Sequence, residues 1–160
     1  MPDAGYDTDF FSWTQDQARR LREAAGVRST LDIDWENVAE EVESLGRADK
    51  HTLGSRLETI LEHLFKLKHS PAAEPRFGWI DTVKRERRQI GLLTEDSPGL
   101  RRLIPELIQV VLADAQGYAG DALEHFGEND AATRLRNDAV DELIERVLDD
   151  GFIPNRPEPS

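Results

Sequence analysis

The fold is decided by residues 34–68, which read DWENVAEEVESLGRADKHTLGSRLETILEHLFKLK. Apolar side chains recur along this stretch at steps of three and four, and this spacing places them on one face of an α-helix. They are Trp35, Val38, Val42, Leu45, Leu53, Leu57, Ile60, Leu64 and Leu67. The sequence therefore predicts a helix over 35–68 whose apolar stripe is buried.

Two features in the middle of this stretch leave its continuity open. Asp49 continues the apolar face at steps of four, a stutter of the kind that locally unwinds a heptad seam. Gly46 and Gly54 flank this point, where a helix can bend. The pattern fits one rod about 50 Å long, at roughly 1.5 Å per residue, and it equally fits two helices joined by a bend.

Four further segments repeat the helical period. They are 8–25, 79–93, a segment that begins at Ser97-Pro98 or at Pro105 and ends at Gly127, and 140–147. An acidic linker is expected between the last two. No stretch alternates apolar and polar residues at period two, so we predict an all-α fold: a small helical bundle of about five helices with one long helix, kinked or straight.

The chain is expected to form one domain with a short tail. Residues 1–153 hold all of the predicted helices, and we assign them to a single helical domain. Residues 154–160 contain three of the eight prolines, and we expect them to form a flexible C-terminal tail.

Composition disfavours several functional classes. Asp and Glu number 32 against 20 Lys and Arg, which gives a net charge of −12. Such a charge repels phosphate backbones and anionic lipid head groups. The chain has no cysteine, which excludes disulfides, thiolate metal sites and cysteine nucleophiles. The N-terminal residues do not resemble a signal peptide, and no apolar run reaches the roughly 18 residues of a membrane span, so we expect a cytoplasmic protein.

An acidic cluster marks the start of helix 35–68. Glu36, Glu40 and Glu43 fall at i, i+4 and i+7, so they share one face, close to Trp35. Carboxylate rows can hold divalent cations, because hard cations prefer several oxygen ligands. A solvated face near a helix N-terminus explains the same row. The sequence lacks the Glu-x-x-His pairs of di-metal bundles, so we assign no metal ligand and predict no cofactor.

Positive charge gathers on residues 84–88, which read Lys-Arg-Glu-Arg-Arg, with Trp79 nearby. We expect this basic helix to pack against the acidic start of helix 35–68, and binding of a phosphate or a nucleic-acid strand is the alternative. Arg87 falls on the apolar stripe of its own helix. We therefore expect Arg87 to be buried and paired with an acidic residue, for which Asp49 and Glu41 are the candidates.

Several blocks of the sequence resemble one family. The blocks are residues 6–14, residues 34–46, residues 63, 64 and 67, residue 79 with 85–90, residues 93, 96–98 and 100, and residues 149–154, of which the Trp-Glu block at 34–46 is specific. They resemble, in order and over nearly the whole chain, the bacterial family called "domain of unknown function 29". The resemblance implies a small α-helical protein of bacteria and cyanobacteria without an assigned activity. It implies no catalytic residue.

Three hypotheses for the function follow. The first is a cytoplasmic helical interaction or accessory module without catalytic activity, assembled as a homodimer or with another protein. The second is a divalent-metal-dependent phosphoester or nucleotide hydrolase that uses the acidic face. The third is a nucleic-acid-linked regulator that docks through residues 84–88. The candidate binding residues are Trp35, Glu36, Glu40, Glu43, Trp79 and Arg87.

Overall fold

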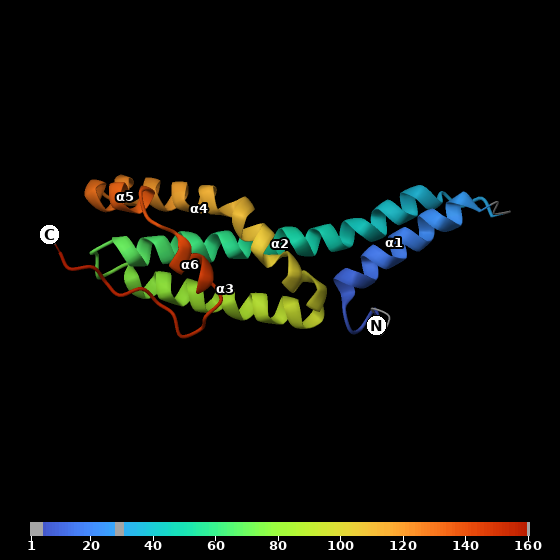
Figure 1. The fold of residues 1–160 in the computed structure, drawn as a ribbon, viewed down its shortest axis with the longest axis horizontal. Coiled ribbons are helices and arrows are strands. Elements are labelled where there is room, and N and C mark those ends of the chain that lie inside the picture. The colour runs from blue at the N-terminus through green and yellow to red at the C-terminus, as the bar shows by residue number, and fades with distance from the viewer. Residues whose placement is uncertain (1–4, 28–30, 160) are drawn as a thin grey trace. The chain divides into compact units, whose positions relative to one another are not determined.

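The computed structural model describes residues 5–27 and 31–159, and these residues form helices and no strand (Figure 1). In chain order, the elements are α1 (Phe10–Gly26), α2 (Trp35–His69), α3 (Arg76–Asp96), the 3-10 helix η1 (Pro98–Leu103), α4 (Ile104–His125), α5 (Asn129–Arg136) and α6 (Asp141–Glu145). The all-α prediction is confirmed. The predicted domain and tail also include residues 1–4, 28–30 and 160, which lie outside the described residues.

The long helix is continuous, and one helix was missed. α2 runs for 35 residues without a break, so the single rod is the correct alternative. The acidic linker expected after α4 is wrong, because α5 lies there. α5 buries only Ala131, Ala132 and Leu135. Two of these side chains are so small that they give almost no hydrophobic period.

The expected start and end of α4 agree with the structure. Both candidate starts are used, since η1 begins at Pro98 and α4 begins at Ile104, next to Pro105. Gly127 ends α4 with φ +80, a left-handed conformation that glycine adopts without strain. Its N–H donates to the carbonyl of Glu124 at 2.9 Å, and the N–H of Glu128 donates to the carbonyl of Leu123 at 2.8 Å.

Two compact units make up the chain. Unit 1 comprises Met1–Leu53 and Gly91–Ile104, and unit 2 comprises Gly54–Ile90 and Pro105–Ser160. The helices α2 and α3 each contribute one part to unit 1 and one part to unit 2. The single domain over 1–153 stays a prediction.

In unit 1, α1 packs antiparallel against the first part of α2 (Figure 1). The contact depends on small residues, because Ala39 and Gly46 of α2 are both buried in it. A Cβ at Gly46 would lie 2.9 Å from Nε2 of Gln15 and closer still to the hydroxyl of Thr14. Thr14 is fully buried and donates its hydroxyl to the carbonyl of Phe11 at 2.7 Å, so it is held in place. We call Ala39 and Gly46 the small-residue seam.

The buried face of the first part of α2 differs from the predicted one, because α1 packs on the small-residue seam. This part of α2 was expected to bury Val38, Val42 and Leu45, but 40% of Val38 and 51% of Leu45 are exposed, and Val42 is half-buried. The buried face lies around the helix from that stripe, because α1 packs where the side chains are smallest. Hydrophobic spacing alone does not reveal this preference, since Ala and Gly contribute little to it.

The core of unit 2 follows the predicted stripe of α2 closely. Fully buried side chains of α2 here are Leu57, Ile60, Leu61, Leu64, Phe65 and Leu67. They are joined by Val83 of α3, Leu123 of α4, Leu135 of α5 and Leu143 of α6. Large aliphatic side chains dominate this interior, in contrast to the small-residue seam of unit 1.

Arg87 of α3 is buried in unit 2, as predicted, but its partners differ from the prediction. Its guanidinium donates to the carbonyl oxygens of Val147 at 2.9 Å, Phe152 at 2.8 Å and Arg146 at 3.2 Å. The expected pairing with Asp49 or Glu41 is therefore wrong. Three carbonyl oxygens at the end of the chain satisfy the buried charge, which ties residues 146–152 to α3. Burial lowers the pKa of Arg87 below its ordinary value.

Replacing Arg87 with Met should lower the free energy of unfolding by about 3 kcal/mol, because three carbonyl oxygens, two of them in buried hydrogen bonds, lose a charged donor. The exposed neighbour Arg88, replaced in the same way, should change it by less than about 0.5 kcal/mol. Urea unfolding of both variants measures the difference. Equal losses in the two variants would contradict the assigned role of Arg87.

Replacing Gly46 with Ala should destabilise unit 1 by about 1–2 kcal/mol, because the new methyl group overlaps the held side chain of Thr14. The matched control is Gly91→Ala in α3, where a Cβ meets nothing within 4 Å. That variant should gain about 0.5–1 kcal/mol from helix propensity. Thermal unfolding of the two variants checks the opposite signs, and a gain for both would show that the seam is not tightly packed.

Candidate functional site

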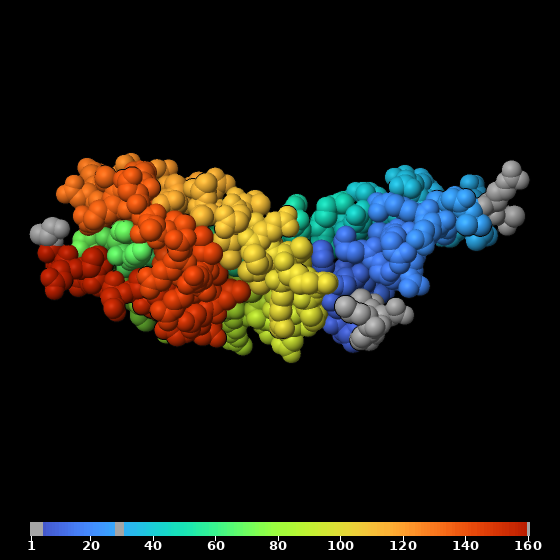
Figure 2. Space-filling view, viewed as in Figure 1, coloured from blue at the N-terminus to red at the C-terminus, as the bar shows by residue number. Residues whose placement is uncertain are grey.

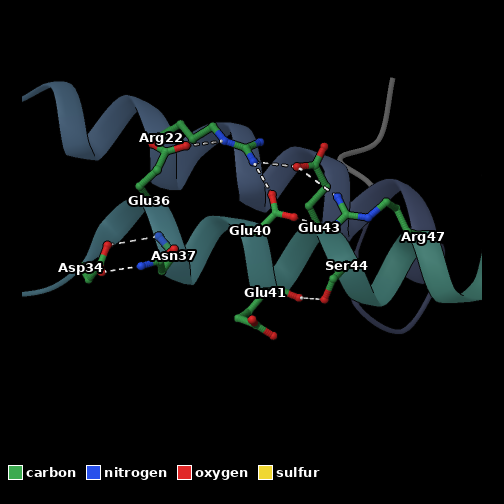
Figure 3. A network of polar contacts seen from close by, with 9 residues as sticks. All are labelled: Arg22, Asp34, Glu36, Asn37, Glu40, Glu41, Glu43, Ser44 and Arg47. Carbon is green, nitrogen blue, oxygen red and sulfur yellow. Dashed lines mark hydrogen bonds and ion pairs between the residues drawn. The ribbon is translucent and has the colours of Figure 1, made fainter.

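The acidic face of α2 is covered by two arginines (Figure 3). Nη2 of Arg22, from α1, donates to Oε2 of Glu43 at 2.6 Å, and its Nε donates to Oε1 of Glu36 at 3.2 Å. Arg22 also reaches Glu40, at 3.4 Å. Arg47 bonds Glu40 from two turns further along α2, and it lies one turn from Glu43, at 3.8 Å. The structure thus brings the three predicted glutamates together around guanidinium groups.

The hydrogen bonds of this network favour the charged form of Arg22. The bonds that Arg22 donates to Glu43 and then to Glu36 raise the pKa of its guanidinium above the ordinary value. The carboxylate oxygens that face α1 are occupied by N–H donors, so a divalent cation would have to displace Arg22 to bind there. The arrangement is that of an ion-pair network between two helices.

The cations that pair with the acidic face are not the ones that the sequence predicted. The segment 84–88 was expected to neutralise the acidic face, but Arg22 and Arg47 do so. Within unit 2, Arg85 instead pairs with Asp81 of its own helix at 2.9 Å, and Glu86 accepts from Arg56 at 2.8 Å. Sequence reasoning missed Arg22, although its place on α1 becomes predictable once the antiparallel pairing of α1 and α2 is known.

Trp35 begins α2 beside the acidic face. Its indole N–H is buried and has no acceptor among the described residues. Just before it, Asp34 caps the helix by accepting from the backbone N–H of Asn37 at 3.2 Å and from its side-chain amide at 2.6 Å. The start of α2 is therefore held by a local cap, which explains why a helix begins here.

A different set of residues forms the exposed side of unit 1. Val38, Val42 and Leu45, which we call the apolar flank, lie on the opposite side of the small-residue seam from the acidic face, at 3.6 residues per turn. Among the described residues, no side chain covers Val38 or Leu45 fully, since 40% of Val38 and 51% of Leu45 are exposed. The apolar flank was predicted to be core and is instead a surface.

The apolar flank continues at Asp49 into a cavity of about 500 Å³ in unit 1. The lining residues of this cavity are Tyr6, Asp7, Phe10, Asp49, Leu93, Asp96 and Ser97. Tyr6 stands edge-on to the rings of Phe10 and Trp13. Burial, and then the charge of Asp96, raise the pKa of the Asp49 carboxyl above its ordinary value. The predicted inward charge of α2 thus lies half-buried at an aromatic and acidic cavity.

The other two candidate residues, Trp79 and Arg87, belong to unit 2 and play different parts. Trp79 is half-buried, with Nζ of Lys66 5.5 Å from the centre of its ring. It lines a groove of about 820 Å³ together with Pro71, Pro75 and Phe126. Arg87 lies in the interior with its N–H groups occupied by carbonyl oxygens, so it belongs to the core and not to a binding face.

Two kinds of feature are absent from residues 5–27 and 31–159. No three side chains of His, Asp or Glu are arranged there so that they could hold a metal ion. None of the helices in that part of the chain combines the length and the apolar character needed to cross a bilayer.

Comparison with known proteins supports the fold and gives no activity. The family model described as "Domain of unknown function DUF29" matches residues 6–152. A solved structure also matches, the crystal structure of an alpha-helical protein of unknown function from Rhodospirillum rubrum ATCC 11170. The TM-score is 0.66 at 26% sequence identity, over 89% of this chain and 96% of that chain. None of the curated proteins matches the chain.

Replacing Arg22 with Met should lower the melting temperature, because Glu36, Glu40 and Glu43 then repel one another with only Arg47 nearby. Added Mn²⁺ should raise the melting temperature of this variant, since a cation can take the vacated place, and should leave that of the wild type unchanged. Arg19→Met, which removes exposed pairs to Asp16 and Glu23 on α1, is the control. A Mn²⁺-dependent rise in the wild type would favour the metal hypothesis instead.

Proposed function

We propose that this chain, which belongs to the family described as domain of unknown function DUF29, is a helical interaction module that forms a homodimer through the apolar flank of α2. The observation that carries the proposal is the exposure of Val38 and Leu45 on a helix face whose sequence has the pattern of a core. Exposed apolar surface of this kind is stabilised when a second surface covers it.

The chemistry of the apolar flank favours a second copy as its partner. Its three side chains are aliphatic and lie at steps of four and three on one helix, which is the spacing of helix-on-helix packing. Two copies related by a two-fold axis can bury the same three side chains against each other. The net charge of −12 opposes this association at long range, so the dimer should become tighter as salt screens the charge.

The alternatives have less support from the geometry. For a metal-dependent hydrolase, Glu36, Glu40 and Glu43 would serve as ligands, yet their oxygens accept from Arg22 and Arg47. For a nucleic-acid-linked regulator, residues 84–88 would have to present a row of free cations. Arg87 is buried in that row, and Arg85 is paired with Asp81. A cytoplasmic location fits a fold that needs no disulfide, and we include it in the proposal.

The test is the mass of the purified chain in solution, measured by sedimentation over a range of concentrations and at low and high salt. We expect the wild type to shift from monomer to dimer as concentration rises, and at lower concentration in high salt. Leu45→Glu should remain monomeric, because it places a charge within the contact. Its melting temperature as a monomer should change little, since half of Leu45 already faces solvent.

The matched control is His51→Glu, which adds a glutamate at an exposed position on another face of α2. This variant should dimerise as the wild type does. A wild type that stays monomeric at every concentration, or a Leu45→Glu variant that dimerises normally, would refute the proposal.

A further inference from the structure

We propose that the groove of unit 2 beside Trp79 and Phe126 binds an extended, proline-rich segment of a partner protein that carries an arginine. We further infer that the chain's own tail, residues 154–159, occupies the edge of this groove as a built-in competitor. The inference goes beyond the proposed dimer, because it concerns a different unit and none of the residues of the apolar flank.

The walls of the groove suit such a segment. Trp79 and Phe126 supply aromatic rings, and Pro71 and Pro75 supply rigid apolar surface, around a volume of about 820 Å³. Phe126 is 74% exposed, so its ring lies open to a ligand. Aromatic-lined grooves favour proline-rich segments, because a polyproline helix is already extended and loses little conformational entropy on binding. The volume falls within the range of known ligand pockets.

The chain itself shows how a segment of this chemistry binds here. The tail reads Pro154-Asn155-Arg156-Pro157-Glu158-Pro159, and no described part of it belongs to a helix. Arg156 donates from Nε to the carbonyl oxygen of Pro71 at 2.6 Å. Pro159 lines the groove. In Figure 2 the red tail lies against the green end of the α2–α3 region of unit 2, as these contacts require.

A second arginine holds the start of the tail. Arg76 donates to the carbonyl of Leu67 at 2.8 Å and also to the carbonyl of Pro154. Pro154 is buried, whereas Arg156 and Pro159 are exposed. The tail is therefore anchored firmly at its first residue and only lightly beyond it. A partner segment can displace residues 156–159 without disturbing the anchor.

Burial and then the charge of Arg156 lower the pKa of Arg76, so these two arginines repel each other, and it is two carboxylates that favour an arginine at the groove. Glu74 and Glu128 both line it. Glu128 accepts from the hydroxyl of Ser70 at 2.6 Å, while Glu74 forms no ion pair with a described residue. The carbonyl oxygen of Pro71 offers an acceptor for a guanidinium, as its bond from Arg156 illustrates. A proline-rich segment with an arginine meets all of these groups.

The experiment uses a fluorescently labelled peptide with the sequence of residues 154–160, whose anisotropy is followed as protein is added. The proteins are the full chain and a chain that ends at Asn155, which keeps the anchor at Pro154. We expect the shortened chain to bind the peptide at least about tenfold more tightly, because the tethered tail no longer competes at high effective concentration. Arg156→Ala in the full chain should increase binding in the same direction, and it keeps the chain length unchanged.

Two further variants locate the binding on the groove. Phe126→Ala in the shortened chain should weaken binding about tenfold, since a central aromatic contact is lost. Phe77→Ala is the matched control: Phe77 is 80% exposed on α3 and does not line the groove, so its loss should leave binding unchanged. A peptide with the three prolines replaced by alanine should bind weakly.

The proposal is overturned if the shortened chain, shown by circular dichroism to be folded, gives no saturable binding. It is also overturned if the full and shortened chains bind equally, or if the alanine peptide binds as well as the proline peptide. Binding that Phe77→Ala and Phe126→Ala reduce equally would contradict it as well. None of these results bears on dimerisation, which Leu45→Glu tests separately.

Discussion

The close approach of α1 to α2 at Gly46 is the constraint on which the surface of unit 1 depends. Because Gly46 has no Cβ, the side chains of Thr14 and Gln15 can lie where a methyl group would otherwise be. Helices pack where their surfaces come closest, and here the small-residue seam allows that. Because α1 occupies the seam, one neighbouring side of α2 forms ion pairs with α1 and the other side stays exposed. Both results follow from this one contact.

On one side of the seam, α1 brings Arg22 opposite three glutamates, so the acidic face becomes an ion-pair network and loses the open oxygens that a metal would need. On the other side, α1 leaves 40% of Val38 and 51% of Leu45 exposed. The same packing that neutralises the charged residues exposes the apolar ones.

Unit 2 is built differently. Large aliphatic residues form its core, and Arg87 ties residues 146–152 to α3 through backbone carbonyls. A second arginine, Arg76, holds the first residue of the tail, Pro154, at the end of α2.

Spacing alone was sufficient to predict the helical fold, the two ends of α2 and the burial of Arg87, because strong hydrophobic periods and a charged residue within one are local signals, but it left the continuity of α2 open. The partners of these residues were not predictable in the same way. Arg87 was expected to meet a carboxylate and meets three carbonyl oxygens, which no side-chain pattern encodes. Val38 and Leu45 were expected in the core because the period counts apolar residues and ignores the small ones that set the packing. α5 was missed for the same reason, since Ala131 and Ala132 bury well and contribute little to a hydrophobic period.

The most direct test of the account is the reactivity of a thiol placed on the apolar flank, which is straightforward because the chain has no cysteine of its own. Leu45→Cys should react with a thiol reagent more slowly as protein concentration rises, while His51→Cys, on another exposed face of α2, should react at a constant rate. This result would show that a second copy covers the apolar flank. Equal and concentration-independent rates at the two positions would contradict the central claim that this exposed stripe is an interface.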